Sequence, residues 1–251
     1  TRYRPVDGTR HQESDILLLQ HLNPGTGLAI HFIMSASSSS STSTITTTPP
    51  AWFYYWIPPL YIGWRIWWAN RIPLMDCDEV YNYWEPLHFL LYGTGFQTWE
   101  YANDYALRTY AYLTPLYGIA KVYEVLIPYL PAWWWPLLTS QEVVVSAEHK
   151  VALFTLLRAT LAAGMAMSEL SFCQALVERS SSIIGLVTTG LLLSSAGMSH
   201  ASGALLPSST LTMLWLLAAA AFLRQQHVRF VVVAITATLA IGWPFGVLLF
   251  V

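Results

Sequence analysis

Long apolar stretches alternate with short polar connections along the second half of the chain. A membrane-spanning helix needs about 20 predominantly apolar residues. Several stretches approach that length: residues 151–177, 183–200, 204–223 and 230–251. Residues 51–69 are also apolar and rich in Trp and Tyr, but Pro58 and Pro59 interrupt them. We therefore expect a kinked or interfacial first span there, and we expect the chain to form an all-α polytopic membrane protein.

The remaining sequence divides into a polar N-terminal segment and a long internal loop. Residues 1–50 are polar, aperiodic and end in a Ser/Thr tract, so we expect them to be disordered. They carry no signal-peptide pattern, and since the first residue is Thr1, we expect Met34 to be the natural start. Residues 51–251 form part of a transmembrane domain, in which residues 70–150 are a loop of short amphipathic helices at the membrane interface. The sequence stops inside an apolar run, so we expect a fragment.

Charge on the short connections predicts the topology. The connections 178–182 and 224–229 both carry arginine, and the second is basic. The positive-inside rule therefore places both of them in the cytosol. By alternation, the 70–150 loop and the turn near Ser199 and His200 lie on the opposite side of the membrane.

Composition supports a bilayer environment and narrows the range of partners. Only 10% of the 251 residues are charged and 55% are hydrophobic, whereas soluble domains carry about 25% charged residues. The formal net charge of −2 gives no electrostatic basis for binding nucleic acid. Cys77 and Cys173 form neither a metal-ligand spacing nor an obvious disulfide pair.

The highest density of charge lies in the loop, where three carboxylates occupy four positions: Asp76, Asp78 and Glu79. Asp76 and Glu79 have the spacing of a helix capping box, which is a purely structural alternative to a functional role. That alternative leaves Asp78 without a structural task. Because neighbouring carboxylates repel one another and destabilise the loop, we expect at least one of them to take part in chemistry.

The residues that follow the acidic cluster predict the mouth of a pocket. Pro86 disfavours helical geometry at Glu85 and can open the next helix, with His88 in its first turn. The predicted mouth is lined by Asp78, Glu79, Glu85 and His88. These residue types at this spacing match a metal site only weakly, and we expect no metal ligand among them.

Two arginines are candidates for binding phosphate, and each has a structural alternative. Arg108 can offer its planar guanidinium to a phosphate, or it can form an i, i+4 ion pair with Asp104. Arg158 lies in the predicted 151–177 span, eleven residues before Glu169 and on nearly the same helix face. It can reach a lipid phosphate, form an interhelical salt bridge, or snorkel to the interface.

The loop between residues 76 and 112 resembles a known family. It reads DCDEVYNYWEPLHFLLYGTGFQTWEYANDYALRTYAY. The D-C-D-E, NYWEP, YG-x-GFQTWEY and YA-[LI]-R-[ST]-YAY elements resemble the first lumenal loop of the dolichyl-phosphate-mannose-dependent alpha-1,2-mannosyltransferases of asparagine-linked glycosylation. Further on, SSAGMSHASGALLPSS (194–209) and GWPF (242–245) resemble blocks of the same family. The resemblance covers about residues 70–251 and does not extend to residues 1–50.

The resemblance implies a GT-C fold, in which many membrane helices carry an acidic first lumenal loop over the active site. It also implies a reaction in the endoplasmic-reticulum membrane. Mannose would pass from dolichyl-phosphate mannose to a mannose 2-hydroxyl of a lipid-linked oligosaccharide, with inversion at the anomeric centre. One carboxylate suffices as general base, and a phosphate leaving group needs no acid. No cofactor is implied besides the donor substrate.

Within that reaction, we predict Asp78 as the base, with Glu79 as second choice and as a ligand of the acceptor. Arg108 and Arg158 are the predicted phosphate ligands. Further residues of the predicted substrate site are Asp76, Glu85 and His88. Besides the donor and the acceptor, the expected partners are membrane lipids.

Three other interpretations compete with this one. A transporter fragment would place charges near the membrane midplane, often in repeated halves, but the sequence has no evident repeat and its densest charge lies in a loop. A non-catalytic partner subunit would keep the fold, although the intact acidic motif favours an enzyme. The related enzymes of glycosylphosphatidylinositol assembly carry an H-P-D-E-type loop, and D-C-D-E favours the asparagine-linked branch instead.

Overall fold

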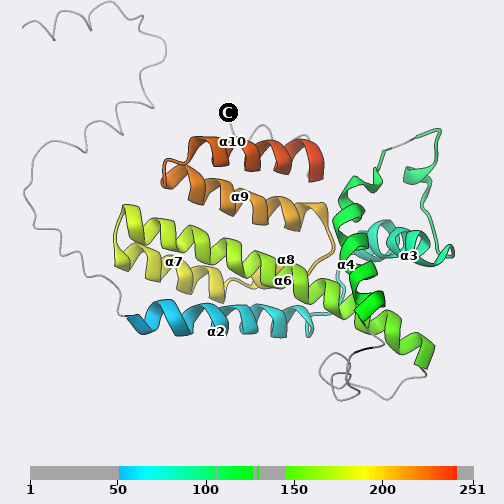
Figure 1. The fold of residues 1–251 in the computed structure, drawn as a ribbon, viewed down its shortest axis with the longest axis horizontal. Helices are drawn as coiled ribbons and strands as arrows, with labels where there is room; N and C mark the ends of the chain where they lie inside the picture. Colours follow the sequence, from blue (N-terminus) through cyan, green and yellow to red (C-terminus); the bar gives the residue numbers. More distant parts are fainter. Residues whose placement is uncertain (1–50, 106, 127–128, 130–144, 242–251) are drawn as a thin grey trace, which may run out of the picture. The chain divides into compact units, whose positions relative to one another are not determined.

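Every regular element in the described part of the chain is helical (Figure 1). The computed structural model describes residues 51–105, 107–126, 129 and 145–241. Its elements are α2 (Ala51–Ala69), η2 (Glu79–Trp84), α3 (Glu85–Tyr92), η3 (Trp99–Tyr101), η4 (Tyr110–Tyr112), α4 (Leu113–Leu126), α6 (Val145–Arg179), α7 (Ser182–Ser194), α8 (Ala196–Ser202), α9 (Pro207–Leu223), α10 (His227–Ile235) and η7 (Thr236–Ile241). All of them belong to one compact unit, Thr46–Val251. The predicted disordered segment 1–50 and the GWPF block at 242–245 lie outside the described residues.

Helix α6 forms the centre of the bundle, because it packs against α2, α7, α8 and α9. Figure 1 shows α2, α7 and α9 running alongside it. Small buried residues such as Ala162 and Ala166 lie along α6 and allow neighbouring helices to approach closely. The segment His149–Arg179 is the one helix among the described residues that is by itself long and apolar enough to cross a membrane. The helix predicted at 151–177 is thereby confirmed.

The predicted third span, 183–200, is broken rather than continuous. Helix α7 ends at Ser194, α8 begins at Ala196, and the two are bent by 70° relative to each other. Ser195 is extended, with φ −69° and ψ 115°, and its hydroxyl accepts a hydrogen bond from the Met198 N–H at 3.3 Å. A serine that caps a new helix competes with continuation of the old one, so the prediction of a single helix was wrong. Taken together, the bent pair is a second candidate span.

Helix α2 continues through Pro58 and Pro59, where the sequence predicted an interruption. Its buried stripe comprises Tyr61, Arg65 and Ala69. These residues follow one another at intervals of four and therefore share one helix face. Trp64 and Trp67 lie off this stripe and are exposed. The helix is thus amphipathic in an unusual sense, because its buried face carries an arginine and its exposed face carries tryptophans.

The segments that were predicted to share one side of the membrane lie together in the bundle, and the side that each end faces stays a prediction. Arg224, which follows α9, pairs with Glu178 at 2.8 Å and donates to the Ser171 hydroxyl at 3.1 Å. The two short connections therefore lie at one end, as predicted. Near the other end, the Leu205 N–H donates to Glu79 Oε1 at 3.0 Å. This bond joins the turn after α8 to the acidic motif, so the loop and that turn lie at the same end, as predicted.

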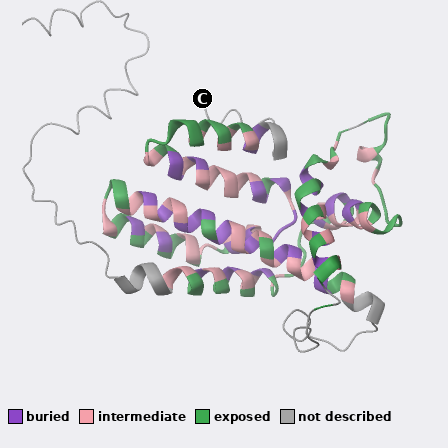
Figure 2. Ribbon diagram, viewed as in Figure 1, coloured by how far each residue is buried: buried purple, intermediate pink, exposed green. Residues whose placement is uncertain are grey.

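The loop packs onto the N-terminal part of α6 and shares a hydrophobic core with it (Figure 2). Fully buried members of this core include Leu87, Leu113, Leu153 and Leu157. The short helices predicted within 70–150 are present as η2, α3, η3, η4 and α4. Helix α6 begins at Val145 and so includes the last residues that were assigned to the loop.

The last two predicted spans are helical but shorter than expected in the described region. Helix α9 begins at Pro207 and not at 204, because proline suits the first position of a helix. Its 17 residues are fewer than the roughly 20 that a span needs. Helix α10 begins at His227, ahead of the predicted start at residue 230. The part of that span beyond residue 241 lies outside the described residues.

Candidate functional site

The acidic motif forms a turn in which its three carboxylates have different environments. Asp76 Oδ1 accepts a hydrogen bond from the Asp78 N–H at 2.9 Å, and the Asp76 carbonyl accepts from the Glu79 N–H at 3.3 Å. Asp76 therefore stabilises the turn, as the capping alternative predicts. Glu79 does not complete the capping box, because its carboxylate points into the protein and bonds to Leu205. Of the capping box expected for Asp76 and Glu79, the structure therefore contains the Asp76 bond and lacks the Glu79 bond.

Glu79 is buried, with 1% of its surface exposed. Besides the Leu205 N–H, its carboxylate faces Arg158 Nη1 at 4.0 Å. Burial raises the pKa of Glu79, while the Leu205 N–H and Arg158 oppose that rise. Arg158 also donates to the Ile72 carbonyl at 3.1 Å. The Glu79 carboxylate is therefore shielded from solvent, and its predicted role as second-choice base and acceptor ligand stays a prediction.

Arg158 adopts the salt-bridge alternative that the sequence left open. It is buried beside Glu79 and is stacked against Phe154, whose ring centroid lies 5.7 Å away. Its Nε has no hydrogen-bond partner in the described part of the chain. Glu169, which shares a face of α6 with Arg158, pairs instead with Arg65 of α2 at 2.8 Å. The two charges of α6 therefore serve two different ion pairs.

Asp78 is partly exposed, with 42% of its side chain accessible, and it lies between the exposed Asp76 and the buried Glu79. Its Oδ1 accepts from Asn82 Nδ2 at 2.9 Å, and its Oδ2 accepts from Arg108 Nη2 at 2.9 Å. Asn82 is one turn further along the chain, as the i, i+4 spacing requires. Both oxygens of Asp78 are thus oriented by fixed donors while the carboxylate remains accessible.

Arg108 joins the last block of the loop to the acidic motif. Its Nε donates to Glu100 at 2.6 Å, its Nη2 donates to Asp78, and its Nη1 donates to the Tyr83 hydroxyl. Burial by itself lowers the pKa of Arg108, but these oxygens outweigh burial, so the pKa is raised and the guanidinium stays charged. The alternative ion pair with Asp104 is wrong, since the arginine reaches back to Glu100 instead.

Asn82 connects the network to the middle of the loop. Its side-chain oxygen accepts from the Thr98 hydroxyl at 2.6 Å, and its carbonyl accepts from the Tyr101 hydroxyl at 2.6 Å. The i, i+4 spacing predicted that Asn82 and Asp78 share a face, but the sequence reasoning missed the roles of Glu100 and Tyr83 as partners of this network. A signal was present, because these residues lie within the NYWEP and GFQTWEY blocks on which the family resemblance rests.

Glu85 and His88 stabilise the turn that follows α3. Glu85 Oε2 accepts from the Phe96 N–H at 3.0 Å, and His88 Nδ1 donates to the Thr94 carbonyl at 2.6 Å. Gly93 takes the left-handed conformation (φ 71°) that ends α3, and a Cβ on Gly95 would lie 2.9 Å from the Glu85 carbonyl. The turn therefore approaches α3 closely, and glycine is required at both positions.

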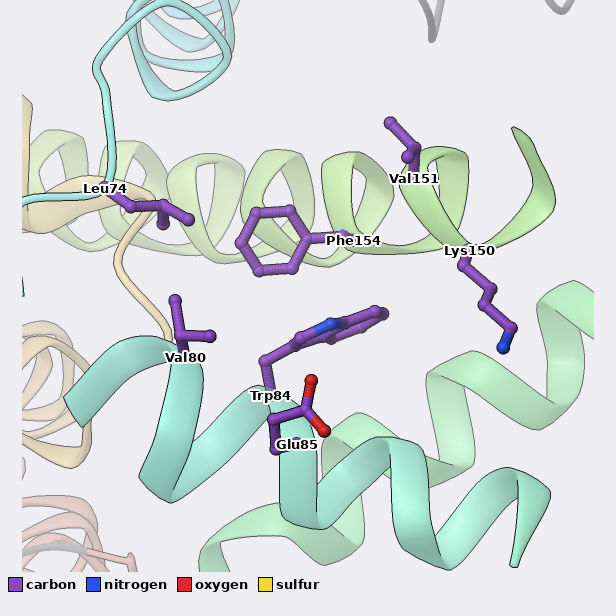
Figure 3. Close-up of a pocket in the computed structure, with 7 residues that line it drawn as sticks. All are labelled: Leu74, Val80, Trp84, Glu85, Lys150, Val151 and Phe154. Carbon is purple, nitrogen blue, oxygen red and sulfur yellow. The ribbon is translucent and has the colours of Figure 1, made fainter. Parts of the chain in front are cut away.

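A pocket of about 300 Å³ lies between the loop and the N-terminal part of α6 (Figure 3). It is lined by Leu74, Val80, Trp84, Glu85, Lys150, Val151 and Phe154. Trp84 and Phe154 meet edge to face, with ring centroids 4.9 Å apart. Of the four residues predicted to share one pocket mouth, Glu85 alone lines this pocket. The prediction of a common mouth for Asp78, Glu79 and His88 is therefore wrong for this pocket.

Asp76, Cys77 and Asp78 each offer a ligand atom, and these atoms lie within 4.8 Å of one another. Hard cations such as Mg²⁺ prefer oxygen ligands, and a thiolate suits softer metals. Both oxygens of Asp78 already accept hydrogen bonds. The donor set therefore fits neither type of metal well, and the expectation of a reaction without metal stays a prediction.

These features describe a helical protein with one or two candidate membrane spans among its described residues and with an oriented, partly exposed carboxylate on a polar network. The chain matches the Alg9-like mannosyltransferase family over residues 56–251, and it belongs to that family of membrane mannosyltransferases. The family expected from the loop sequence is thereby confirmed. No solved structure matches the chain.

Several curated relatives carry the name alpha-1,2-mannosyltransferase ALG9. The chain is 34% identical to the Arabidopsis thaliana protein over 175 residues, which are 70% of this chain and 27% of the relative. It is 34% identical to the Homo sapiens protein over 173 residues, which are 69% of this chain and 25% of the relative. For the Schizosaccharomyces pombe protein, the identity is 36% over 174 residues, 68% of this chain and 27% of the relative. The chain thus spans about a quarter of the length of these relatives.

Proposed function

We propose that this chain, in its full-length form, transfers mannose from dolichyl-phosphate mannose to a lipid-linked oligosaccharide and forms an alpha-1,2 linkage with inversion. Membership of the Alg9-like family and the names of the relatives support this reaction. The structural observation that carries the proposal is Asp78, a partly exposed carboxylate whose two oxygens are fixed by Asn82 and Arg108. We further propose a GT-C-type fold in the endoplasmic-reticulum membrane, with the loop on the lumenal side.

In this proposal, Asp78 is the general base. It takes the proton of the attacking mannose 2-hydroxyl as that oxygen bonds to the anomeric carbon of the donor. The bond between this carbon and the phosphate oxygen breaks on the opposite face, and dolichyl phosphate leaves with the electron pair. A positioned base contributes about 10²- to 10⁴-fold to such a step. The phosphate leaves as an anion, so no second carboxylate is needed to protonate it.

The surrounding residues support that step from different positions. Arg108 is charged, orients Asp78, and offers the positive charge closest to it in the network. Asp76 and Glu79 hold the turn from either side, the former by its side-chain bond to the Asp78 N–H and the latter by its bond to Leu205. Arg158 lies behind Glu79, so we assign it to stabilising the buried carboxylate and only through it to the phosphate site.

We assign the pocket between the loop and α6 to the lipid part of a polyprenyl-linked substrate. Its walls are apolar at Leu74, Val80 and Val151, as an isoprenoid chain requires. Glu85 and Lys150 add one group of each charge, and Lys150 also lies 5.1 Å from the ring centroid of Tyr92. His88 would then act indirectly, because its bond to Thr94 supports the turn that Glu85 also holds.

The proposal is tested with the full-length protein, completed from its transcript and purified in detergent. Wild type, Asp78→Asn and Asp104→Asn are incubated with dolichyl-phosphate mannose and a lipid-linked mannose acceptor, with and without chelator. Asp104 is the matched control, because it is an exposed loop aspartate outside the network described for Asp78. We expect transfer by wild type and Asp104→Asn, and a loss of about 10²-fold or more in Asp78→Asn. Wild-type turnover in Asp78→Asn would refute the assigned base, and no transfer by wild type with or without Mg²⁺ or Mn²⁺ would refute the reaction.

A further inference from the structure

Arg65 of α2 is fully buried, and every nitrogen of its guanidinium donates a hydrogen bond. Nε and Nη2 donate to the two carboxylate oxygens of Glu169 at 2.9 and 2.8 Å. Nη1 donates to the Ser199 hydroxyl at 2.8 Å. Nη2 also donates to the Leu192 carbonyl at 2.7 Å and to the Tyr61 hydroxyl at 3.3 Å. One side chain therefore joins α2, α6, α7 and α8.

The partners of Arg65 lie on both sides of the break between α7 and α8. Leu192 belongs to the last turn of α7, and its carbonyl also accepts a hydrogen bond from the Ser195 N–H at 3.3 Å. Ser199 lies in α8, beyond the 70° bend. A guanidinium offers several donors in a rigid fork, so it can hold two backbone directions at a fixed angle. The bend is thus stabilised by Arg65 as well as by the Ser195 cap.

Helix α2 also contacts the turn that follows α8. A Cβ on Gly203 would lie 2.5 Å from the Cβ of Ala69, one turn after Arg65 in α2. Two residues later, the Leu205 N–H donates to Glu79. The chain beyond α2 reaches the same carboxylate by a second path, because the Ile72 carbonyl accepts from Arg158, which faces Glu79.

We infer that Arg65 is a positioning residue for the acidic motif. By holding α7 and α8 at their bend with the help of Glu169 and Ser199, it places the Leu205 N–H against Glu79 and so fixes the turn that carries Asp78. A buried ion pair is weak evidence for stability, and conformational specificity is the role that such pairs can serve. The catalytic part of this inference rests on the function proposed for Asp78, and the placement of the turn does not.

The test uses the full-length protein in detergent and the variants Arg65→Met, Glu79→Gln and their combination. Arg71→Met is the matched control, because Arg71 follows the same helix and stacks on Trp67, with 5.1 Å between its guanidinium carbon and the ring centroid. Cys77 is an exposed natural probe inside the acidic motif. Its rate of alkylation by iodoacetamide is measured by mass spectrometry on the peptide that contains it. Mannose transfer is measured in parallel as kcat and KM.

We expect Arg65→Met to change the Cys77 alkylation rate by at least about twofold, the lower end of the coupling seen between residues of one network. Arg71→Met should leave the rate at its wild-type value. Adding Arg65→Met to Glu79→Gln should cause little further change, because both act on the same turn. In the transfer assay, kcat should fall while KM changes little, since Arg65 contacts neither substrate.

Two results would overturn the inference: a wild-type Cys77 rate in Arg65→Met, or effects of Arg65→Met and Glu79→Gln that multiply independently. If Arg65→Met does not fold, Arg65→Met/Glu169→Leu replaces it, because removing both charges leaves neither one buried alone. If the wild-type protein transfers no mannose, the proposed function fails, and the Cys77 measurement still decides whether Arg65 positions the motif.

Discussion

Arg65 in the bundle and Arg108 in the loop each anchor a polar cluster, and the two clusters differ in whether their carboxylates are accessible to a ligand. Arg65 in the bundle and its partner Glu169 are completely buried, and the pair joins helices that are far apart in sequence. Arg108 in the loop has 14% of its side chain exposed, and its partner Asp78 has 42% exposed. The first cluster leaves no group for a ligand. The second orients a carboxylate and still presents it to the surface, which is what a catalytic base requires.

The difference also predicts different energetic consequences. Removing one partner of a buried ion pair leaves an uncompensated charge, whereas exposed ion pairs contribute little because water replaces the lost partner. Substitutions in the bundle should therefore act mainly on folding. Substitutions in the loop should act mainly on activity. Four measurements, given in order of expected effect on stability, test this contrast.

The largest effect is expected for Arg65→Met. It leaves Glu169 buried without its counterion, so the free energy of unfolding should fall by about 3–5 kcal/mol. Thermal unfolding in detergent measures the loss. Arg65→Met/Glu169→Leu should recover most of it, and Arg71→Met should change the midpoint little. A loss in the double variant as large as in Arg65→Met would contradict the electrostatic explanation.

A smaller effect is expected for Gly203→Ala, because the new methyl group would meet the Cβ of Ala69 at 2.5 Å. Overpacking of this kind costs about 1–3 kcal/mol. Ala69→Gly in the same protein should restore stability by making room for the methyl group. Gly63→Ala is the control, since nothing lies within 4 Å of its Cβ position, and it should be neutral or stabilise α2 by up to about 1 kcal/mol. Equal losses in the two alanine variants would argue against close packing at Gly203.

Arg108→Met should separate activity from stability. The unfolding free energy should fall by only about 1 kcal/mol or less, because the ion pair is partly exposed. Mannose transfer by the full-length protein should fall by about 10²-fold, as expected when a fixed cation of an active site is lost. The two quantities are measured on the same preparation. If the free energy of unfolding falls as much as expected for Arg65→Met, Arg108 belongs with the structural cluster instead.

The smallest effect is a pH dependence carried by Glu79. Burial raises its pKa in the folded protein, so the neutral acid is favoured by folding. This contribution is fully present below the ordinary glutamate pKa of about 4.3 and is lost as the pH rises through the raised value. The thermal stability of wild type should therefore fall, relative to that of Glu79→Gln, as the pH rises through that window. Parallel pH profiles for the two proteins would contradict the raised pKa.

Local sequence patterns predicted much of the fold and part of the site. The apolar run at 151–177 gave a helix because its length and hydropathy suffice by themselves. Asp76 stabilises its turn as its position predicts, and Asp78 is left accessible by the same geometry. The break at Ser195 was not predicted, because one serine in an apolar run carries too weak a signal against the hydrophobicity around it.

Partner choice was the part that sequence could not supply. Glu169 was considered together with Arg158, because they share a helix face, yet its partner is Arg65, 104 residues away. Arg108 was considered together with Asp104, yet it bonds Glu100 and Asp78. In each case, helical spacing in the sequence predicted which side chains share a face. The actual partner came from a different segment of the chain.

The helical class of this protein, its family, and the motif that holds the candidate base could all be predicted from the sequence. Those properties follow from local composition and from residue blocks that are read one after another along the chain. Only the fold shows that Glu79 is buried while Asp78 stays partly exposed, and that Glu79 faces Arg158 while Asp78 pairs with Arg108. Burial and ion pairing depend on contacts between distant segments, and in this protein the bend after α7 brings the Leu205 N–H to Glu79, while Asp78 stays partly exposed.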